Sequence, residues 1–182
     1  MKQRKQLRSQ IINAWADSIF DDYHAKRINS ERALQASLWA ALVRQLNDNR
    51  RIFIEPSFMV SQRKITPDLV ICNSRSVIAV IELKYQPRGT AKYAKDIRNL
   101  GLLARHRDEA KMSDARFRGL DDRVKSYPLA SHVLFVWAGV HTKPRSFPDQ
   151  LFSDGHPALN ACFLELHAET TKGRAPEIYI RE

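Results

Sequence analysis

The sequence predicts an α/β fold in which helices flank a central mixed sheet. Two amphipathic helical segments come first, apolar strand segments follow, and one further helix separates the early strands from the late ones. With 182 residues, the chain is long enough to bury a sizeable core. No repeat, low-complexity tract or Gly/Ser linker divides it, so we expect one domain over residues 1–182.

Two helices are expected before the first strand. From about Gln3 to Tyr23, apolar residues recur every four positions, as in an amphipathic helix: Leu7, Ile11, Trp15 and Ile19. A second helix should begin near Asn29 or Ser30, which are both good N-caps, and end near Asn47. Its apolar stripe consists of Leu34, Leu38, Leu42 and Leu46.

Strand segments follow the second helix. Residues 51–60 favour one strand, closed or bulged at Pro56. Residues 67–73 and 76–84 favour two more, with a hairpin turn between them. A third helix is expected from about Ala91 past Arg105, with Tyr93, Ile97, Leu100 and Ala104 on one face. The remaining strands are a strongly apolar one at residues 131–140 and two weaker ones at residues 161–167 and 177–180.

The composition indicates a basic intracellular protein. Thirty Lys and Arg against twenty Asp and Glu give a formal charge of +10, which favours a polyanionic partner such as nucleic acid over a merely basic surface. Cys72 and Cys162 lie in separate apolar strands, which suits a reducing compartment. No apolar run is long enough to span a bilayer, and the N-terminus lacks a signal-peptide pattern. We therefore expect a cytoplasmic location and no membrane partner.

Residues 66–85 place charged side chains in segments that otherwise suit a core. In a strand, residues two apart share a face, so Ile78, Val80, Glu82 and Lys84 are expected to point one way. Asp68 on the adjacent strand would bring a second carboxylate to the same place, and two close carboxylates repel unless a cation lies between them. Carboxylate oxygens and the Leu83 carbonyl would suit Mg²⁺ or Mn²⁺, with Lys84 orienting an attacking water. The alternative is a Glu82–Lys84 pair at a strand end and Asp68 in a turn.

Pro67-Asp68, thirteen intervening residues and then Glu82-Leu83-Lys84 resemble the PD-(D/E)XK motif of the restriction-endonuclease-like nucleases. The order of elements over residues 29–140 is similar to that family's αβββαβ core, preceded here by an extra N-terminal helix. The resemblance implies that Asp68 and Glu82 bind metal and that Lys84 is the motif lysine. It also matches Glu31 to an acidic residue in the first core helix, where the carboxylate would complete the metal site or simply complement the helix dipole.

Several basic residues follow the motif and are candidates for nucleic-acid binding. They are Arg88, Lys92, Lys95 and Arg98, and the bias continues through Arg105, Arg107, Lys111, Arg116, Arg118, Arg123 and Lys125, with Phe117 and Tyr127 interleaved. Some nucleases of this superfamily carry a Gln on the following helix; here that region holds Asp96, which we expect to pair with Lys92 or a nearby Arg on a solvated face. His141 is expected in a loop.

The leading functional hypothesis is an enzyme: a Mg²⁺- or Mn²⁺-dependent nuclease that hydrolyses phosphodiester bonds by attack of a metal-activated water. DNA is the favoured substrate, with RNA left open, and cutting both strands with one site per chain would favour a homodimer. The alternative is a nucleic-acid-binding protein in which the nuclease fold is catalytically silent. The two hypotheses differ in whether the carboxylates bind metal.

Overall fold

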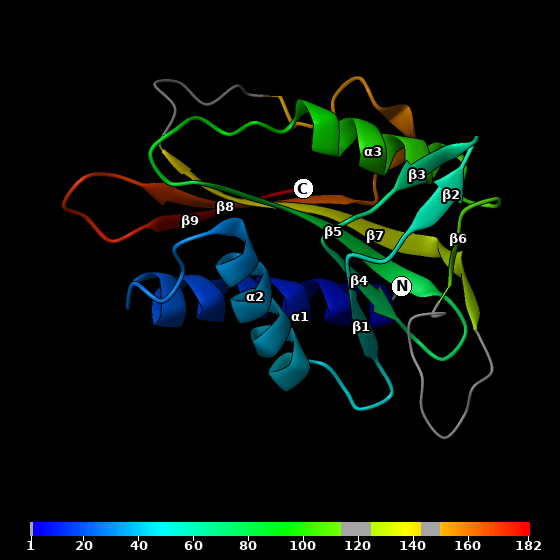
Figure 1. Cartoon of the computed structure of the whole chain (residues 1–182), viewed down its shortest axis with the longest axis horizontal. Coiled ribbons are helices and arrows are strands. Elements are labelled where there is room, and N and C mark those ends of the chain that lie inside the picture. The colour runs from blue at the N-terminus through cyan, green and yellow to red at the C-terminus, as the bar shows by residue number, and fades with distance from the viewer. Residues whose placement is uncertain (1, 114–124, 143–149) are drawn as a thin grey trace.

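The computed structural model describes residues 2–113, 125–142 and 150–182, and it confirms the α/β class. A mixed open sheet of nine described strands lies between two helical layers (Figure 1). The helical elements are α1 (Lys2–Asp17), the π-helical η1 (Ser18–Tyr23), α2 (Glu31–Gln45), α3 (Ala94–Arg105) and the short 3₁₀ helix η2 (Pro157–Leu159). The strands are β1 (Arg51–Ile54), β2 (Phe58–Val60), β3 (Arg63–Ile65), β4 (Leu69–Cys72), β5 (Val77–Gln86), β6 (Lys111–Ser113), β7 (Ser126–Thr142), β8 (Phe163–Thr170) and β9 (Glu177–Arg181).

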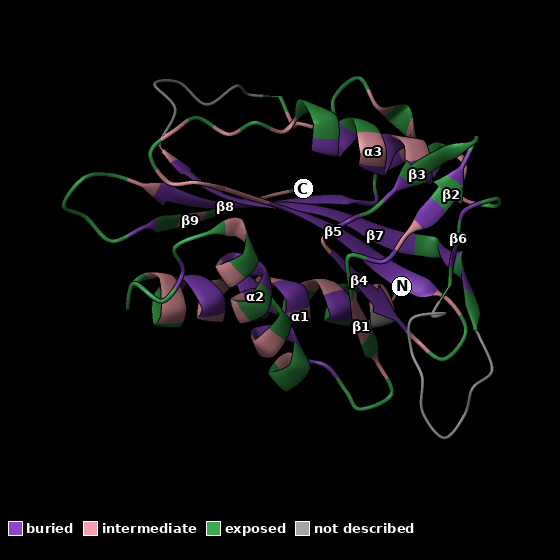
Figure 2. Cartoon of the chain, viewed as in Figure 1, coloured by how far each residue is buried: buried purple, intermediate pink, exposed green. Residues whose placement is uncertain are grey.

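The helices use the apolar stripes that the sequence predicts. All four stripe residues of α1 and η1 are buried, and so are all four associated with α2. The Ser30 hydroxyl caps α2 by accepting a hydrogen bond from the Ala33 N–H at 3.2 Å, which fixes where that helix begins. Helices α1 and α2 cover one face of the sheet and α3 covers the other, each with its buried side inward (Figure 2).

The sheet is antiparallel at one side and parallel in its middle. Strand β4 pairs antiparallel with both β1 and β5, whereas β5, β7 and β8 run parallel to one another. Strand β7 also pairs through its first residues with β6, which leads to β2 and β3. The central strands are buried on both faces, as parallel strands between two helical layers require.

Three details of the strands differ from the prediction. Residues 51–60 form two strands, because Glu55 adopts a left-handed conformation (φ +48°) that ends β1 before Pro56. Short strands β3 and β6 were not anticipated. An irregular register near the start of β5 also turns Ile78 toward the α1–α2 layer, while Val80 packs under α3, so the expectation that these two share a face is wrong.

Both cysteines, Cys72 and Cys162, are buried, and no disulfide joins them. Within the described ranges, no helix has the length and apolar character needed to cross a membrane.

Candidate metal centre at the end of strand β5

Asp68 and Glu82 lie side by side at the junction of β4 and β5. The register pairs Leu69 with Ile81, and continuing it by one residue places Asp68 opposite Glu82. The two carboxyl groups share a hydrogen bond, and Glu82 is only 6% exposed. The strand alternation that predicted this pairing from sequence therefore brings both acids to the sheet face under α3.

Burial and mutual repulsion disfavour the charged forms of both carboxyls. Burial raises the pKa of Asp68 to about 6. Burial, followed by the nearby charges of Asp68 and Asp96, raises the pKa of Glu82 well above its usual value. Both shifts favour the protonated forms, so the pair binds a proton more tightly than two exposed carboxyls would. A cation bound between them would displace that proton and relieve the repulsion.

The main chain at Leu83 offers a third oxygen. The Leu83 N–H donates to Asp68 Oδ2 at 2.6 Å, so this peptide edge faces the β4 side. In an antiparallel pair, the N–H and C=O of one residue point toward the same neighbour, so the Leu83 carbonyl also faces that side. The residue opposite in the continued register is Pro67, which has no N–H to donate. A proline at that position cannot donate a ladder hydrogen bond to the carbonyl.

Lys84 lies between carboxylates from both helical layers. Its Nζ is 3.3 Å from Glu31 Oε2 at the start of α2 and 3.8 Å from Asp96 Oδ2 in α3. Burial acts to lower the pKa of Lys84, but the charges of Asp96 and Glu31 outweigh it and raise the pKa. The ammonium group is therefore held in its charged form beside the carboxyl pair.

Glu31 acts on the main chain as well as on Lys84. The oxygen that faces Lys84 also accepts a hydrogen bond from the Tyr85 N–H at 3.2 Å. Glu31 is close enough for its charge to contribute to the raised pKa of Asp68. In this arrangement Glu31 positions the lysine, and its expected role in completing a metal site stays a prediction.

The expectation that Asp96 pairs on a solvated face is wrong. Asp96 is 8% exposed, and burial raises its pKa, with Lys84 opposing that effect. The reason is the register of α3, in which Asp96 lies one turn before the buried Leu100. That spacing was available in the sequence and would have identified Asp96 as an inward-facing acid.

Two of the four predicted nucleic-acid-binding residues line different hollows, and no contact of the structure tests their role. Arg88 lines one hollow, whereas Arg98 lines another between α3 and β3, together with Arg63, Lys64 and Arg105. Lys95 is exposed on α3, and the Lys92 main chain bonds to the Gln86 side chain. Of the further basic and aromatic candidates, Arg116, Phe117, Arg118 and Arg123 lie outside the described residues.

The available ligands suit a hard divalent cation with water completing its coordination. Among the described residues, no group of three or more His, Cys, Asp or Glu side chains could enclose a metal ion. What the site offers is two carboxylates and one main-chain carbonyl, all oxygen donors. Mg²⁺ typically uses one or two carboxylates and keeps several waters, so the donor set fits Mg²⁺ or Mn²⁺.

A second buried polar network continues across the same face of the sheet, through β7 and β8. The Nε2 atom of His141 is 2.9 Å from His167 Nδ1, and His167 Nε2 is 3.1 Å from Glu165 Oε2. Arg181 of β9 also approaches that carboxylate, at 3.4 Å. The expectation that His141 lies in a loop is wrong, because β7 extends to Thr142 and buries it. In the sequence, this network was indicated only by the spacing of Glu165 and His167, which are two positions apart in a strand and therefore share a face.

Gly139 separates the two polar groups. It pairs with Lys84 on one side and His167 on the other, and the indole of Trp137 packs over it. A Cβ at position 139 would lie 2.3 Å from that ring. Glycine is therefore required here for the indole to lie flat between the candidate metal centre and the histidines.

Comparisons of this chain with protein-family models, with curated proteins and with solved structures give no match. The class of site defined by the geometry is a carboxylate pair with an adjacent, salt-bridged lysine at the end of a sheet. The function is therefore argued from that site.

Proposed function

We propose that this protein is a metal-dependent nuclease of the PD-(D/E)XK type that hydrolyses phosphodiester bonds in DNA. The proposal is carried by one observation: the adjacent carboxyls of half-buried Asp68 and buried Glu82, both with raised pKa values, lie beside the charged Lys84. The path through the fold supports it. The order of elements is similar to that of the restriction-endonuclease-like core. Helix α2 comes first, then the antiparallel strands around β4 and β5, then helix α3 and the parallel strand β7.

Asp68, Glu82 and the Leu83 carbonyl would hold Mg²⁺ or Mn²⁺. When bound, the cation supplies positive charge for the phosphodiester oxygens and lowers the pKa of a coordinated water. Asp68 and Glu82 must lose their shared proton to bind it, which the cation makes favourable. Pro67 would contribute because it has no N–H with which to engage the Leu83 carbonyl.

Lys84 would orient the attacking water or stabilise charge that develops on the phosphate. Its raised pKa makes the ammonium form dominant at neutral pH, which suits a stabilising role better than a general base. Glu31 and Asp96 hold it from opposite layers, so we assign both as positioning residues for Lys84. The basic surface of the chain, with Arg88, Lys92, Lys95 and Arg98 after the motif, would contact the phosphate backbone.

The test is cleavage of DNA by the purified protein with Mg²⁺ or Mn²⁺, and its loss in chelator. Glu82→Ala and Lys84→Ala should each abolish cleavage while circular dichroism and thermal unfolding show a folded protein. Asp108→Ala is a matched control, because Asp108 is an exposed acid in the turn after the C-terminal end of α3. Full activity in both site variants would overturn the assignment. Salt-sensitive DNA binding without a calorimetric metal isotherm would instead support the catalytically silent alternative.

A further inference from the structure

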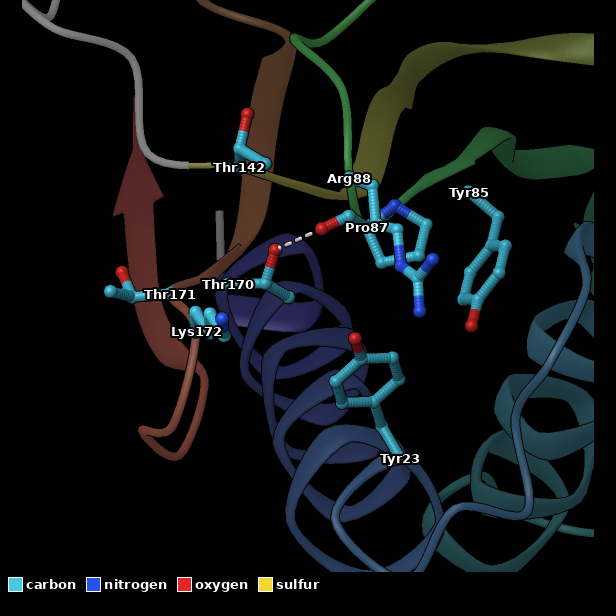
Figure 3. Close-up of a pocket in the computed structure, with 8 residues that line it drawn as sticks. All are labelled: Tyr23, Tyr85, Pro87, Arg88, Thr142, Thr170, Thr171 and Lys172. Carbon is cyan, nitrogen blue, oxygen red and sulfur yellow. Dashed lines mark hydrogen bonds between the residues drawn. The ribbon is translucent and has the colours of Figure 1, made fainter.

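Two adjoining hollows, both lined by the residue that follows Lys84 in the chain, form what we call the tyrosine groove. They have volumes of about 640 and 700 Å³, and both are lined by Tyr23, Tyr85 and Pro87. Figure 3 shows the first of them. Its walls come from η1, from the segment after β5, and from the β8–β9 connection, which are distant in sequence. Volumes of this size are typical of ligand-binding clefts.

The groove carries positive charge without compensation. Arg88 and Lys172 line the first hollow, and Lys26 and Arg174 line the second. No Asp or Glu is among the described residues that line either hollow, and none of the four cations forms a salt bridge with another described residue. An anionic ligand would therefore meet four positive side chains that no carboxylate of the described residues holds in a salt bridge.

Two tyrosine rings border the same space. Their centroids are 6.3 Å apart with an interplanar angle of 67°, and in Figure 3 the Tyr23 hydroxyl points into the hollow. The Tyr85 hydroxyl donates to the Ile28 carbonyl at 2.9 Å, which holds its ring in place. Both rings are only partly buried. A fixed, partly exposed aromatic surface among cations is the combination that binds nucleobases and phosphates together.

The groove is joined to the candidate metal centre through the main chain. The Tyr85 N–H and the Lys84 ammonium group contact the same oxygen of Glu31. Tyr85 follows Lys84 directly in β5, and its ring packs on the α1–α2 side of the sheet, whereas the carboxyl pair lies under α3.

We infer that the tyrosine groove binds an unpaired nucleic-acid strand, with bases on Tyr23 and Tyr85 and phosphates on Arg88, Lys26, Lys172 and Arg174. The inference rests on the proposed function and narrows its substrate class to single-stranded or frayed nucleic acid. Stacking on tyrosine requires a free base face. In a duplex those faces are covered by neighbouring base pairs, and only edges and phosphates are presented.

The experiment measures binding in chelator, so that cleavage plays no part. Fluorescence anisotropy compares a short labelled oligo(dT) with a blunt hairpin duplex of equal length. Tyr23→Ala should weaken oligo(dT) binding about tenfold while Tyr23→Phe retains it, because the ring carries the stacking contribution. Lys172→Ala and Arg174→Ala should each lower the slope of log affinity against log salt by about one. Lys5→Ala, an exposed lysine near the opposite end of α1, should leave both quantities unchanged.

The outcomes separate this inference from the nuclease proposal. Two results would overturn the groove assignment, even if metal-dependent cleavage is observed. One is equal affinity for oligo(dT) and the duplex. The other is wild-type affinity for oligo(dT) in the folded variants Tyr23→Ala and Lys172→Ala. Tyr23-dependent binding of oligo(dT) supports the groove, and it does so even if the protein fails to cleave in Mg²⁺ or Mn²⁺. Such a failure to cleave would overturn only the hydrolytic activity.

Discussion

Replacing Asp68 with asparagine should stabilise the metal-free protein at neutral pH. Asparagine retains an oxygen for the Leu83 N–H but removes the negative charge that Asp68 carries above its raised pKa. Raising the pKa of Asp68 from 3.8 to about 6 corresponds to about 3 kcal/mol of destabilisation once the carboxyl ionises. For a chain of this size, about 1 kcal/mol shifts Tm by about 2–4 °C, so the increase in Tm should be about 6–12 °C at most.

The sign of the pH dependence distinguishes this cause from a general packing effect. A carboxyl with a higher pKa in the folded state binds protons more tightly there, so wild-type stability falls as the pH rises from about 4 to about 6. Urea unfolding in chelator should therefore show equal stabilities near pH 4 and a growing advantage for Asp68→Asn above it. Added Mn²⁺ should stabilise the wild type and not the variant. If Asp68→Asn is no more stable than the wild type at neutral pH, the reasoning is refuted. Asp108→Asn is the control for replacing an exposed acid.

Three further predictions concern the metal site and the buried network beside it. Calorimetric affinity for Mn²⁺ should fall as the pH drops below about 6, because Asp68 must lose its proton to bind a cation; unchanged affinity at lower pH would contradict this. Glu165→Ala should lower the free energy of unfolding in urea by about 3–5 kcal/mol, because it removes the carboxylate that faces the fully buried His167 and Arg181. A decrease below about 1 kcal/mol would argue against this role for Glu165. Gly139→Ala should lower Tm by forcing the Trp137 ring aside, at about 1–3 kcal/mol, whereas Gly89→Ala, with its nearest neighbour 3.9 Å away, should have little effect.

Local patterns in the sequence predicted most of the elements. The leucine spacing and Ser30 predicted α2, and the alternation along 66–85 predicted that Asp68 and Glu82 would meet. These features depend on neighbouring residues or on a single hairpin. The left-handed Glu55 was not predictable in this way, because a non-glycine residue adopts that conformation only when the surrounding structure imposes it.

The missed residues depend on contacts between distant strands and helices. Asp96 reaches Lys84 only because α3 crosses over β5 in one particular register. His141 and His167 are 26 positions apart and meet because β7 and β8 pair in parallel. Parallel partners are joined by long connections, so no local period in the sequence indicates which residues will be neighbours.

Strand β7 has a consequence for how the molecule opens. Its first residues pair with β6, its later residues pair with both β5 and β8, and its side chains enter the hydrophobic clusters on both faces of the sheet. Neither helical layer can detach fully without exposing apolar side chains of this strand. Amide hydrogens at its centre should consequently exchange with solvent only through global unfolding, which makes them reporters of whole-molecule stability when ligands or substitutions are compared.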